Sequence, residues 1–296
     1  MANVVHIIDG NNWFTKHYFT GMDNMTDVVA RWIRFCNGHK GRIIFAFDTT
    51  KSARRLQIYP EYKAGRKTSL TPEQYEAFTK LMGDFRKLVK SMGYTVLCGH
   101  GYEADDYVAV TSRMLKAYDV RIYSTDHDFL QLVNSYISVI WSKPEGEIKI
   151  TPDSFEENVG VGQEYFMDYK CMIGDKSDNI PGIEGIGEVT AKKYIDEYGH
   201  YNEILEALRP KLDAPKKKDQ PNKTELKLIN GENGFNIAKE LIDMSINYKD
   251  LVLRDLIKKA VKETAYHGEA CLEILSENDA ESSFSLVKEL CKTRRK

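Results

Sequence analysis

Short apolar runs alternate with longer amphipathic stretches in the first half of the chain. Four of the runs, at 4–8, 42–47, 95–97 and 120–123, are rich in Val, Ile, Phe and Tyr and do not alternate strictly with polar residues. Continuous runs of this kind are typical of strands that are buried on both faces of a sheet. A further run, "ISVIWS" at 137–142, is predicted to be another strand.

Between these runs the apolar residues recur at helical spacing, which predicts helices over 25–36, 72–92 and 103–118. Strands that alternate with helices favour an α/β fold, with a mainly parallel, Rossmann-like sheet and helices on both faces. From about residue 163 the pattern becomes helical throughout. The Lys-rich segment 211–234, which contains two prolines, is expected to be a mobile loop.

The last part of the chain is less distinctive. The segment "NIAKELIDMSI" at 236–246 is predicted to be an apolar helix or strand, and the last forty residues are predicted to be helical. At 296 residues with 42% apolar content, the chain can form one large domain or two smaller ones with a sizeable core.

Composition excludes several classes of protein. No apolar run approaches the ~18–20 residues that cross a bilayer. The N-terminus, "MANVVHIIDG", lacks a basic region and a signal cleavage site, so a cytoplasmic location is expected. The five cysteines are scattered and include no CxxC pair, which favours reduced thiols over a disulfide framework, a zinc site or a thiolate nucleophile.

Acidic residues follow the apolar runs repeatedly. In a doubly wound sheet, groups that follow the strands gather at the carboxyl edge. An Asp after one strand is ordinarily a turn or helix-cap residue. Two carboxylates ~4 Å apart, however, repel by about 1 kcal/mol in water and ~4 kcal/mol at an effective dielectric of 20, so convergence of many acids requires cations. The nine acids are Asp9, Asp48, Glu103, Asp105, Asp106, Asp126, Asp128, Asp175 and Asp178.

The ligand set contains only oxygen, which favours Mg²⁺ or Mn²⁺ over Zn²⁺. His127 lies between two of the acids in sequence and is expected to point away from the metals. Two such ions ~4 Å apart can activate a water and stabilise both oxygens of an in-line phosphodiester displacement. The residues alone therefore predict a site for phosphoryl hydrolysis.

The charge distribution adds a candidate partner. The net charge of −2 argues against nucleic acid, but residues 51–67 hold six Lys or Arg and a single Glu. Such a run is usually a solvated loop. Its position directly after the strand that ends before Asp48 favours a function, because a cation beside a scissile phosphate stabilises charge that develops in the transition state.

The motifs "IIDGNN", "FDTTKSARRLQIYPEYKAGR", "YEADD", "STDHDF", "MIGDKSDNIPGIEGIG" and "TAKKYI" occur in this order over residues 4–200. Together they resemble the 5′-nucleases, which comprise phage flap endonucleases, RNase H-type 5′-3′ exonucleases and the 5′-nuclease domain of bacterial DNA polymerase I. The resemblance implies a PIN-like core at 1–162 with a helical arch at about 60–95, a helix-hairpin-helix lobe at 163–250, and a C-terminal helical segment at 251–296 that packs back on the core.

The resemblance also implies how the metals are held. Two Mg²⁺ ions are expected, for which Mn²⁺ can substitute. The first metal is then held mainly by Asp9, Asp48, Glu103, Asp105 and Asp126. The second is held by Asp128, Asp175 and Asp178, with Asp106 between the two metals or behind their ligands.

The basic strip "YPEYKAGRK" supplies further candidates. By resemblance, Lys63 and Arg66 lie at the base of the arch that receives the 5′ strand and are expected to be catalytic. Tyr62 could stack on an unpaired terminal base. Lys67 is expected to contact DNA.

The turn "GIEGIG" at 182–187 precedes a predicted helix that begins at about Glu188. Gly185 and Gly187 would let backbone N–H groups approach a phosphate, and Lys192 and Lys193 follow one turn later. Such an element binds a duplex backbone without reading its sequence. By resemblance, the same turn can also hold K⁺.

The expected function is a structure-selective, metal-dependent 5′-3′ exonuclease and flap endonuclease that acts near the 5′ ends of DNA or RNA–DNA, as in primer removal and repair. RNase H activity is a possible addition.

The expected partners are DNA with a 5′ flap, nick or RNA primer, and replication proteins such as a polymerase or single-strand-binding protein. No membrane partner is expected. The chain is expected to be a monomer, in the host cytoplasm if phage-encoded. Two alternatives remain open: a non-catalytic DNA-binding relative, and a PIN-type ribonuclease of single strands.

Overall fold

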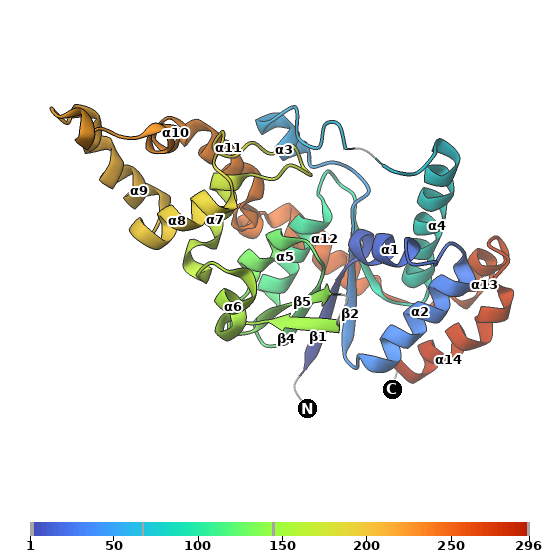
Figure 1. Cartoon of the computed structure of the whole chain (residues 1–296). Coiled ribbons are helices and arrows are strands. Elements are labelled where there is room, and N and C mark those ends of the chain that lie inside the picture. Colours follow the sequence, from blue (N-terminus) through green and yellow to red (C-terminus); the bar gives the residue numbers. More distant parts are fainter. Residues whose placement is uncertain (1–2, 67, 144–145, 295–296) are drawn as a thin grey trace. The chain divides into compact units, whose positions relative to one another are not determined.

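In the computed structural model, the five apolar runs of the first half of the chain form strands of a six-stranded sheet, to which β6 adds the sixth (Figure 1). The structure describes residues 3–66, 68–143 and 146–294. The strand order is β3-β2-β1-β4-β5-β6, and all neighbours are parallel except β5 and β6. The strands are β1 (Val4–Asp9), β2 (Arg42–Phe47), β3 (Thr95–Cys98), β4 (Asp119–Tyr123), β5 (Ile137–Lys143) and β6 (Gly146–Ile150).

The chain divides into two compact units, which are described separately. Unit 1 comprises Met1–Lys51, Thr68–Thr151 and Ser245–Lys296, and it contains the whole sheet. Unit 2 comprises Ser52–Lys67 and Pro152–Met244.

Strand β1 occupies the centre of the sheet because its apolar residues can be buried on both faces. Val5, Ile7 and Ile8 are completely buried. Strands β2 and β3 lie on one side of β1, and β4, β5 and β6 lie on the other. The chain therefore adds strands on one side of β1 up to β3 and on the other side from β4 onward, so the order of strands reverses between the parallel neighbours β1 and β4. In open α/β sheets, ligands bind at the carboxyl ends of the strands at such a reversal.

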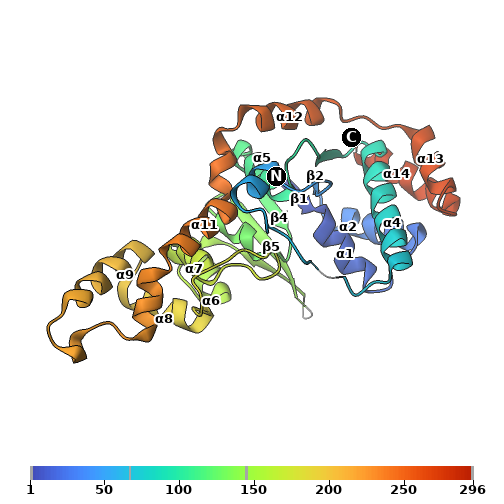
Figure 2. The ribbon, with the colours of Figure 1, turned by 90° about the horizontal axis from the view of Figure 1, so that it is seen from above.

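The helices of unit 1 cover both faces of the sheet (Figure 2). On one face, Trp32 lies 4.8 Å from Phe45, and Trp13 stacks on Phe85 at 5.3 Å, measured between ring centroids. Aromatic pairs at these distances stabilise a core beyond the area they bury. The helices are α1 (Gly10–Tyr18), α2 (Met25–Gly38), α4 (Pro72–Ser91), α5 (Ala104–Met114), α12 (Leu251–Lys262), α13 (Gly268–Ser276) and α14 (Phe284–Arg294).

A buried carboxylate joins α4 to the turn that follows α13. Asp84 is 4% exposed and accepts hydrogen bonds from Lys87, Lys80 and Asn278 at 2.9, 3.0 and 3.3 Å. Burial favours the neutral carboxyl, but these hydrogen bonds outweigh burial and hold the pKa of Asp84 below its ordinary value. A carboxyl with a lowered pKa stabilises the folded state above its unfolded pKa, and that stability is lost as the pH falls through the folded pKa.

Asp84→Asn is therefore expected to lower the free energy of unfolding by about 1.5–3 kcal/mol at pH 7, the range for a hydrogen bond to a charged group. The deficit should shrink toward pH 3, because the carboxyl becomes protonated in the unfolded chain below its ordinary pKa, which removes part of the advantage of the charged form in the folded state. Urea unfolding at both pH values measures it. Asp255→Asn, at an exposed position on α12, is the control and should change little. An equal deficit at pH 7 and pH 3 would contradict the assignment.

Unit 2 is helical, as predicted for the chain after residue 163. Its hydrophobic core includes Ile183, Ile195 and Leu205, all at most 3% exposed. The helices are α3 (Ala53–Ile58), α6 (Phe155–Val159), α7 (Phe166–Ile173), α8 (Glu188–Tyr198), α9 (Tyr201–Leu208), α10 (Lys223–Asn230) and α11 (Glu232–Ile242).

The prediction of a mobile loop at 211–234 is wrong for much of its length, because the segment contains α10 and the start of α11. Asn222 caps α10 by accepting from the N–H of Glu225 at 3.0 Å, and the Glu225 carboxylate accepts from the N–H of Asn222 at 2.7 Å. Glu225 also pairs with Lys211 at 2.6 Å, and Leu228 is completely buried. This reciprocal cap, "NKTE", was readable in the sequence but was obscured by the surrounding lysines and prolines.

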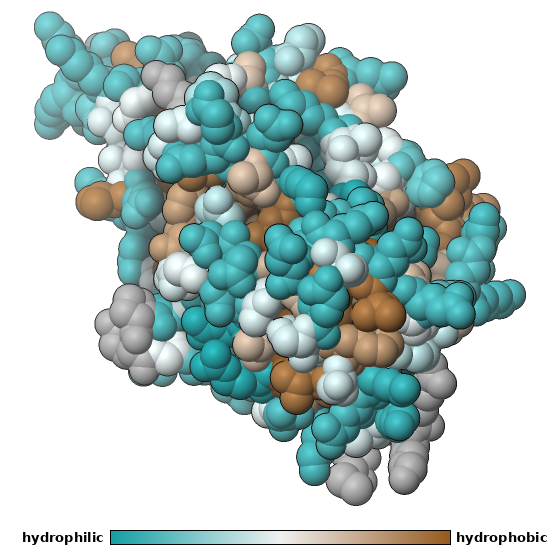
Figure 3. Space-filling view, turned by 90° about the vertical axis from the view of Figure 1, so that its right-hand side faces the viewer, coloured by the Kyte–Doolittle hydropathy of each residue, from teal (hydrophilic) through white to brown (hydrophobic). Residues whose placement is uncertain are grey.

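In the part of the chain that the structure describes, no helix combines the length and the apolar character needed to span a bilayer. Figure 3 shows one face of the molecule, on which hydrophilic residues predominate and hydrophobic ones are interspersed. Scattered exposed apolar residues are normal on a folded protein.

Candidate metal and phosphate site

Seven of the nine predicted acids lie in unit 1, and all seven follow the carboxyl ends of strands β1 to β4. Asp9 ends β1, and Asp48 follows β2 directly. Glu103, Asp105 and Asp106 lie at the beginning of α5, shortly after β3. Asp126 and Asp128 follow β4. The sequence-based placement of these seven acids at one edge of the sheet is thus found in the structure.

Hydrogen bonds connect Asp9 to the turn after β4, at the carboxyl ends of β1 and β4, between which the strand order reverses. Asp9 is 7% exposed, and its Oδ1 accepts from the N–H of Asn12 at 3.1 Å, which caps α1. Its Oδ2 accepts from the hydroxyl of Ser124 at 2.8 Å. The same hydroxyl oxygen accepts from the N–H of Asp126 at 3.0 Å. One serine therefore connects two of the predicted metal ligands.

Asp48 connects the end of β2 to the start of α5. Its Oδ1 accepts from the N–H of Ala104 at 2.6 Å, at the first position of that helix. Its own N–H donates to Asn11 at 2.8 Å. A carboxylate at a helix N-terminus is stabilised by the helix dipole, which favours the charged form of Asp48.

Glu103 and Asp106 are 1% and 2% exposed. Asp106 Oδ2 accepts from the N–H of Glu103 at 2.9 Å, and Oδ1 accepts from the side-chain amide of Asn247 at 2.7 Å. Each oxygen of Asp106 thus already has a protein donor. Asn247, from the segment before α12, was missed by sequence reasoning because nothing local to it indicates a partner 141 residues away.

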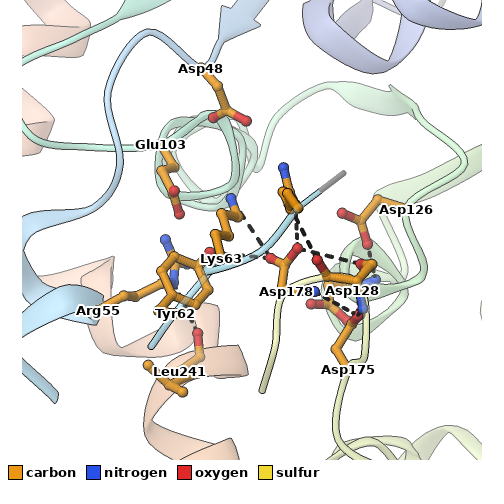
Figure 4. Close-up of polar contacts among 12 residues, drawn as sticks. Asp48, Arg55, Tyr62, Lys63, Glu103, Asp126, Asp128, Asp175, Asp178 and Leu241 are labelled. Carbon is orange, nitrogen blue, oxygen red and sulfur yellow. Dashed lines mark hydrogen bonds and ion pairs between the residues drawn. The ribbon is translucent and has the colours of Figure 1, made fainter. Parts of the chain in front are cut away.

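Asp126 and Asp128 lie at the beginning of a 3₁₀ helix, η1 (His127–Leu132). Asp126 Oδ1 accepts from the N–H of Asp128 at 2.8 Å (Figure 4). His127 lies between them in sequence, and its ring contacts the ring of Trp141 on β5, with centroids 4.5 Å apart.

Among the described residues, no group of three or more His, Cys, Asp or Glu side chains is arranged so as to hold a metal ion. The chemistry of the acids nevertheless suits a hard divalent cation, because every candidate donor is an oxygen. Mg²⁺ is commonly bound through one or two carboxylates and keeps several waters. A closed cage of three or more side chains is therefore not required for the residues to fit this ion.

The other two predicted ligands, Asp175 and Asp178, lie in the turn after α7 in unit 2. Asp175 Oδ1 accepts from the N–H and hydroxyl of Ser177 at 2.8 and 2.7 Å, and the buried Lys170 lies 3.4 Å from Oδ2. Burial favours the neutral acid, but the Ser177 hydrogen bonds and the Lys170 charge outweigh it and lower the pKa of Asp175. Lys170 was also missed by sequence reasoning.

Both predicted catalytic cations contact Asp178, and Figure 4 shows Lys63 beside it. The Lys63 ammonium lies 3.7 Å from Asp178 Oδ2, and the Lys63 N–H donates to the Asp178 carbonyl at 2.8 Å. The Arg66 guanidinium donates to Asp178 Oδ1. Within unit 2 the structure therefore places one predicted metal ligand against two predicted catalytic cations.

Tyr62 does not occupy the position that base stacking requires. Its side chain is 1% exposed within the core of unit 2, and its hydroxyl donates to Asp178 Oδ2 at 3.3 Å. A ring packed in this way is not available to an unpaired base, so the stacking role predicted for it is not supported. Lys67, the other predicted contact in this strip, lies outside the described residues.

The glycine-rich turn precedes α8, as predicted. Gly185 has φ of +73°, and a Cβ at this position would overlap the ammonium of Lys227, which reaches over the turn from α10. Lys192 and Lys193 are exposed on α8 and line a surface hollow of about 530 Å³. Gly187 is the N-cap residue of α8.

A cavity of unit 1, about 1240 Å³, lies near the opposite ends of the strands. It is bordered by residues that include Lys40, Arg42 and Thr95, at or just before the starts of β2 and β3. None of the described residues that line it is acidic. The seven predicted acids of unit 1 therefore lie at the other edge of the sheet from this cavity.

The fold and these sites define a nuclease class, a resolvase-like α/β domain followed by a helical domain. Residues 4–160 match the family model of the 5′-3′ exonuclease N-terminal resolvase-like domain, and residues 161–264 match that of the 5′-3′ exonuclease C-terminal SAM fold. The chain belongs to the 5′-3′ exonuclease family. The resemblance and the fold class predicted from the sequence are confirmed.

Among its relatives is the thermostable DNA polymerase I of Thermus thermophilus, 36% identical over 195 residues, which cover 65% of this chain and 22% of that protein. DNA polymerase I of Deinococcus radiodurans is 32% identical over 247 residues, 79% of this chain and 24% of that protein. The chain thus spans less than a quarter of the length of these relatives.

Among the solved structures that share the fold are the T5 D15 protein and the catalytic core of Rad2. The T5 D15 protein, co-crystallised with metal ions, superposes with a TM-score of 0.73 at 24% identity over 88% of this chain and all of that one. The catalytic core of Rad2, in complex with a DNA substrate, superposes with a TM-score of 0.54 at 14% identity over 99% of this chain and 92% of that one.

Proposed function

We propose that the chain is a divalent-metal-dependent 5′-3′ exonuclease and flap endonuclease that hydrolyses phosphodiesters near the 5′ ends of DNA or RNA–DNA. One observation carries the proposal. The Ser124 hydroxyl joins Asp9 to the turn of Asp126 where the sheet reverses, at the edge that carries seven acids. Membership of the 5′-3′ exonuclease family supports the same reaction.

The proposed cofactors are two Mg²⁺ ions, for which Mn²⁺ can substitute. When bound, they would activate a water and stabilise the oxygens of an in-line displacement. The acids of the first ion are Asp9, Asp48, Glu103, Asp105 and Asp126, and those of the second are Asp128, Asp175 and Asp178. The existing hydrogen bonds of Asp106 suit a residue that orients its neighbours.

Lys63 and Arg66 are the proposed catalytic cations. Each contacts Asp178, so their charges are held in place before any substrate arrives. Cations fixed in this way can stabilise negative charge that develops on a scissile phosphate without reorganising during the reaction.

Duplex binding is assigned to Gly185 and Gly187 of the turn, to Lys192 and Lys193 on α8, and to Lys67. The turn is also the proposed K⁺ site. One related structure, of the T5 D15 flap endonuclease, is a pseudo-enzyme-product complex with DNA and metal ions, which supports DNA as the substrate. Binding through phosphates should weaken steeply with salt, because cations on the protein release counterions from the nucleic acid.

The proposed substrates are DNA with a 5′ flap, a nick or an RNA primer. The relatives named DNA polymerase I support a replication setting, in which a polymerase or single-strand-binding protein would be a partner. A monomer acting in the cytoplasm, with RNase H activity on primers, completes the proposal.

Removal of the metal tests this proposal directly. Labelled 5′-flap, nicked and RNA-primed duplexes should be cut in Mg²⁺, remain intact in EDTA, and be cut again when excess Mn²⁺ is added. Product lengths separate flap cleavage from exonuclease action. Duplex binding without cleavage in either metal would indicate a non-catalytic relative, and cleavage of unstructured RNA alone would indicate a single-strand ribonuclease.

A further inference from the structure

Arg55, on α3 in unit 2, is a buried cation that the proposed reaction does not use. Its side chain is only 2% exposed. A buried charge is costly unless hydrogen bonds compensate for it. The Arg55 Nε–H donates to the carbonyl of Leu241 at 3.0 Å (Figure 4). The neighbouring Arg54 donates through Nη1 to the carbonyl of Glu240 at 2.8 Å.

Both carbonyls belong to the last turn of α11, which ends at Ile242. The last four carbonyls of a helix lack partners within it, and this end of the helix carries a partial negative charge. The two arginines satisfy two of these carbonyls with charge-assisted hydrogen bonds. Helix α3 is thereby fixed to the end of α11.

Arg55 also contacts the residue before Lys63. The Arg55 guanidinium lies 5.9 Å from the centroid of the Tyr62 ring, and the Lys63 ammonium lies 5.0 Å from the same centroid (Figure 4). The Tyr62 hydroxyl donates to Asp178, the carboxylate that pairs with Lys63. One buried ring thus contacts the buried arginine, the proposed catalytic lysine and that lysine's partner.

The backbone of Lys63 needs such support. Its φ is +54°, in the left-handed region, which is strained for a residue with a side chain. A strained residue keeps this conformation only where its surroundings fix it. Its N–H donates to the Asp178 carbonyl, and the fixed ring of Tyr62 immediately precedes it.

We propose that Arg55 is a positioning residue for Lys63. It fixes Tyr62 relative to the end of α11, and Tyr62 in turn fixes the direction of the Lys63 side chain beside Asp178. Arg55 itself does not touch the substrate. The inference rests on the proposed catalytic role of Lys63 and adds a residue through which that role is maintained.

A double-mutant cycle tests the inference in the full chain. Arg55→Met keeps the length of the side chain but removes its charge and donors. We expect kcat on a 5′-flap duplex to fall about 10- to 100-fold, the range for loss of a group that orients an active-site residue. KM and duplex Kd should stay within about twofold. In the Lys63→Ala background, Arg55→Met should lower kcat no further, because its effect passes through the missing ammonium.

Arg54→Met is the matched control. It removes the parallel hydrogen bond to α11 and leaves Arg55 in place. It should therefore lower kcat less than about threefold. Arg55→Lys keeps a charge and one donor and should recover part of the lost kcat. If Arg55→Met fails to fold by circular dichroism, Tyr62→Leu replaces it and should show the same loss and the same non-additivity.

Three outcomes would overturn the inference. An equal loss of kcat in the wild-type and Lys63→Ala backgrounds would show that Arg55 acts independently of Lys63. A parallel loss of duplex affinity in Arg55→Met and Arg54→Met would show a general structural role. If Lys63→Ala retains full turnover, the proposed catalytic role of Lys63 fails, and the inference about Arg55 fails with it. The first two outcomes instead contradict the role of Arg55 alone and leave the proposed function standing.

Discussion

Asp126→Asn is expected to lower cleavage of a 5′-flap duplex on the order of 10²- to 10³-fold in saturating Mg²⁺, the range for loss of a group that stabilises charge in the transition state. Asparagine keeps the shape of the side chain and an oxygen that can still accept from the Asp128 N–H. It removes the negative charge that would attract a divalent cation. The loss should therefore appear in metal affinity as well as in turnover.

The same strand supplies a matched control for Asp126→Asn. Asp119 begins β4 at the other edge of the sheet and pairs with Arg121 at 2.7 Å. Asp119→Asn changes the net charge equally and should leave cleavage within about twofold. Mn²⁺ titration by calorimetry should show weaker binding only in Asp126→Asn. Unchanged Mn²⁺ binding and turnover in Asp126→Asn would remove this residue from the metal site.

The sheet could be predicted because its strands are buried on both faces. The apolar runs that form β1, β2, β4 and β5 have no other stable position, so their composition determines where they lie. Strand β6 was missed because its sequence, "GEIKI", places mostly exposed or half-exposed residues at the edge of the sheet. An edge strand gains its partners from the neighbouring strand, and its own sequence carries a weak signal.

The positions of the acids could also be predicted, because the topology of a parallel sheet brings the residues after its strands to one edge. The groups that hold the acids could not. Ser124 reaches Asp9 across 115 positions of sequence, and Asn247 reaches Asp106 across 141. These hydrogen bonds are tertiary, and neither Ser nor Asn in its own segment distinguishes such a role from an ordinary surface position.

Tyr62 shows the converse limit of sequence reasoning. A tyrosine within a basic strip is a reasonable partner for a base. The strip, however, folds onto the core of unit 2, and the ring is buried beside Arg55. Whether an aromatic side chain in such a strip faces solvent or core depends on tertiary contacts. Here the carbonyl at the end of α11 that accepts from Arg55 lies 186 residues further along the chain.

The burial of Lys63 explains why its substitution should affect turnover more than duplex binding. Lys63 is 8% exposed, and its ammonium is committed to Asp178 and the face of Tyr62. A cation held in this way contributes little to the long-range attraction of a duplex, which depends on exposed charges such as Lys192 and Lys193. It can still meet a single phosphate that is brought to it.

Lys63→Ala is therefore expected to lower kcat on a 5′-flap duplex on the order of 10²- to 10³-fold, with duplex Kd within about twofold of the wild type. The salt dependence of binding adds a second readout. Lys63→Ala should leave the slope of log Kd against log salt unchanged. Lys192→Ala should reduce the magnitude of that slope by about 1, the change for one lost phosphate contact. Lys239→Ala, at an exposed position on α11, controls for loss of a lysine from the same unit. Equal losses of affinity in Lys63→Ala and Lys192→Ala, with turnover preserved at saturating substrate, would make Lys63 a binding residue and remove it from the chemistry.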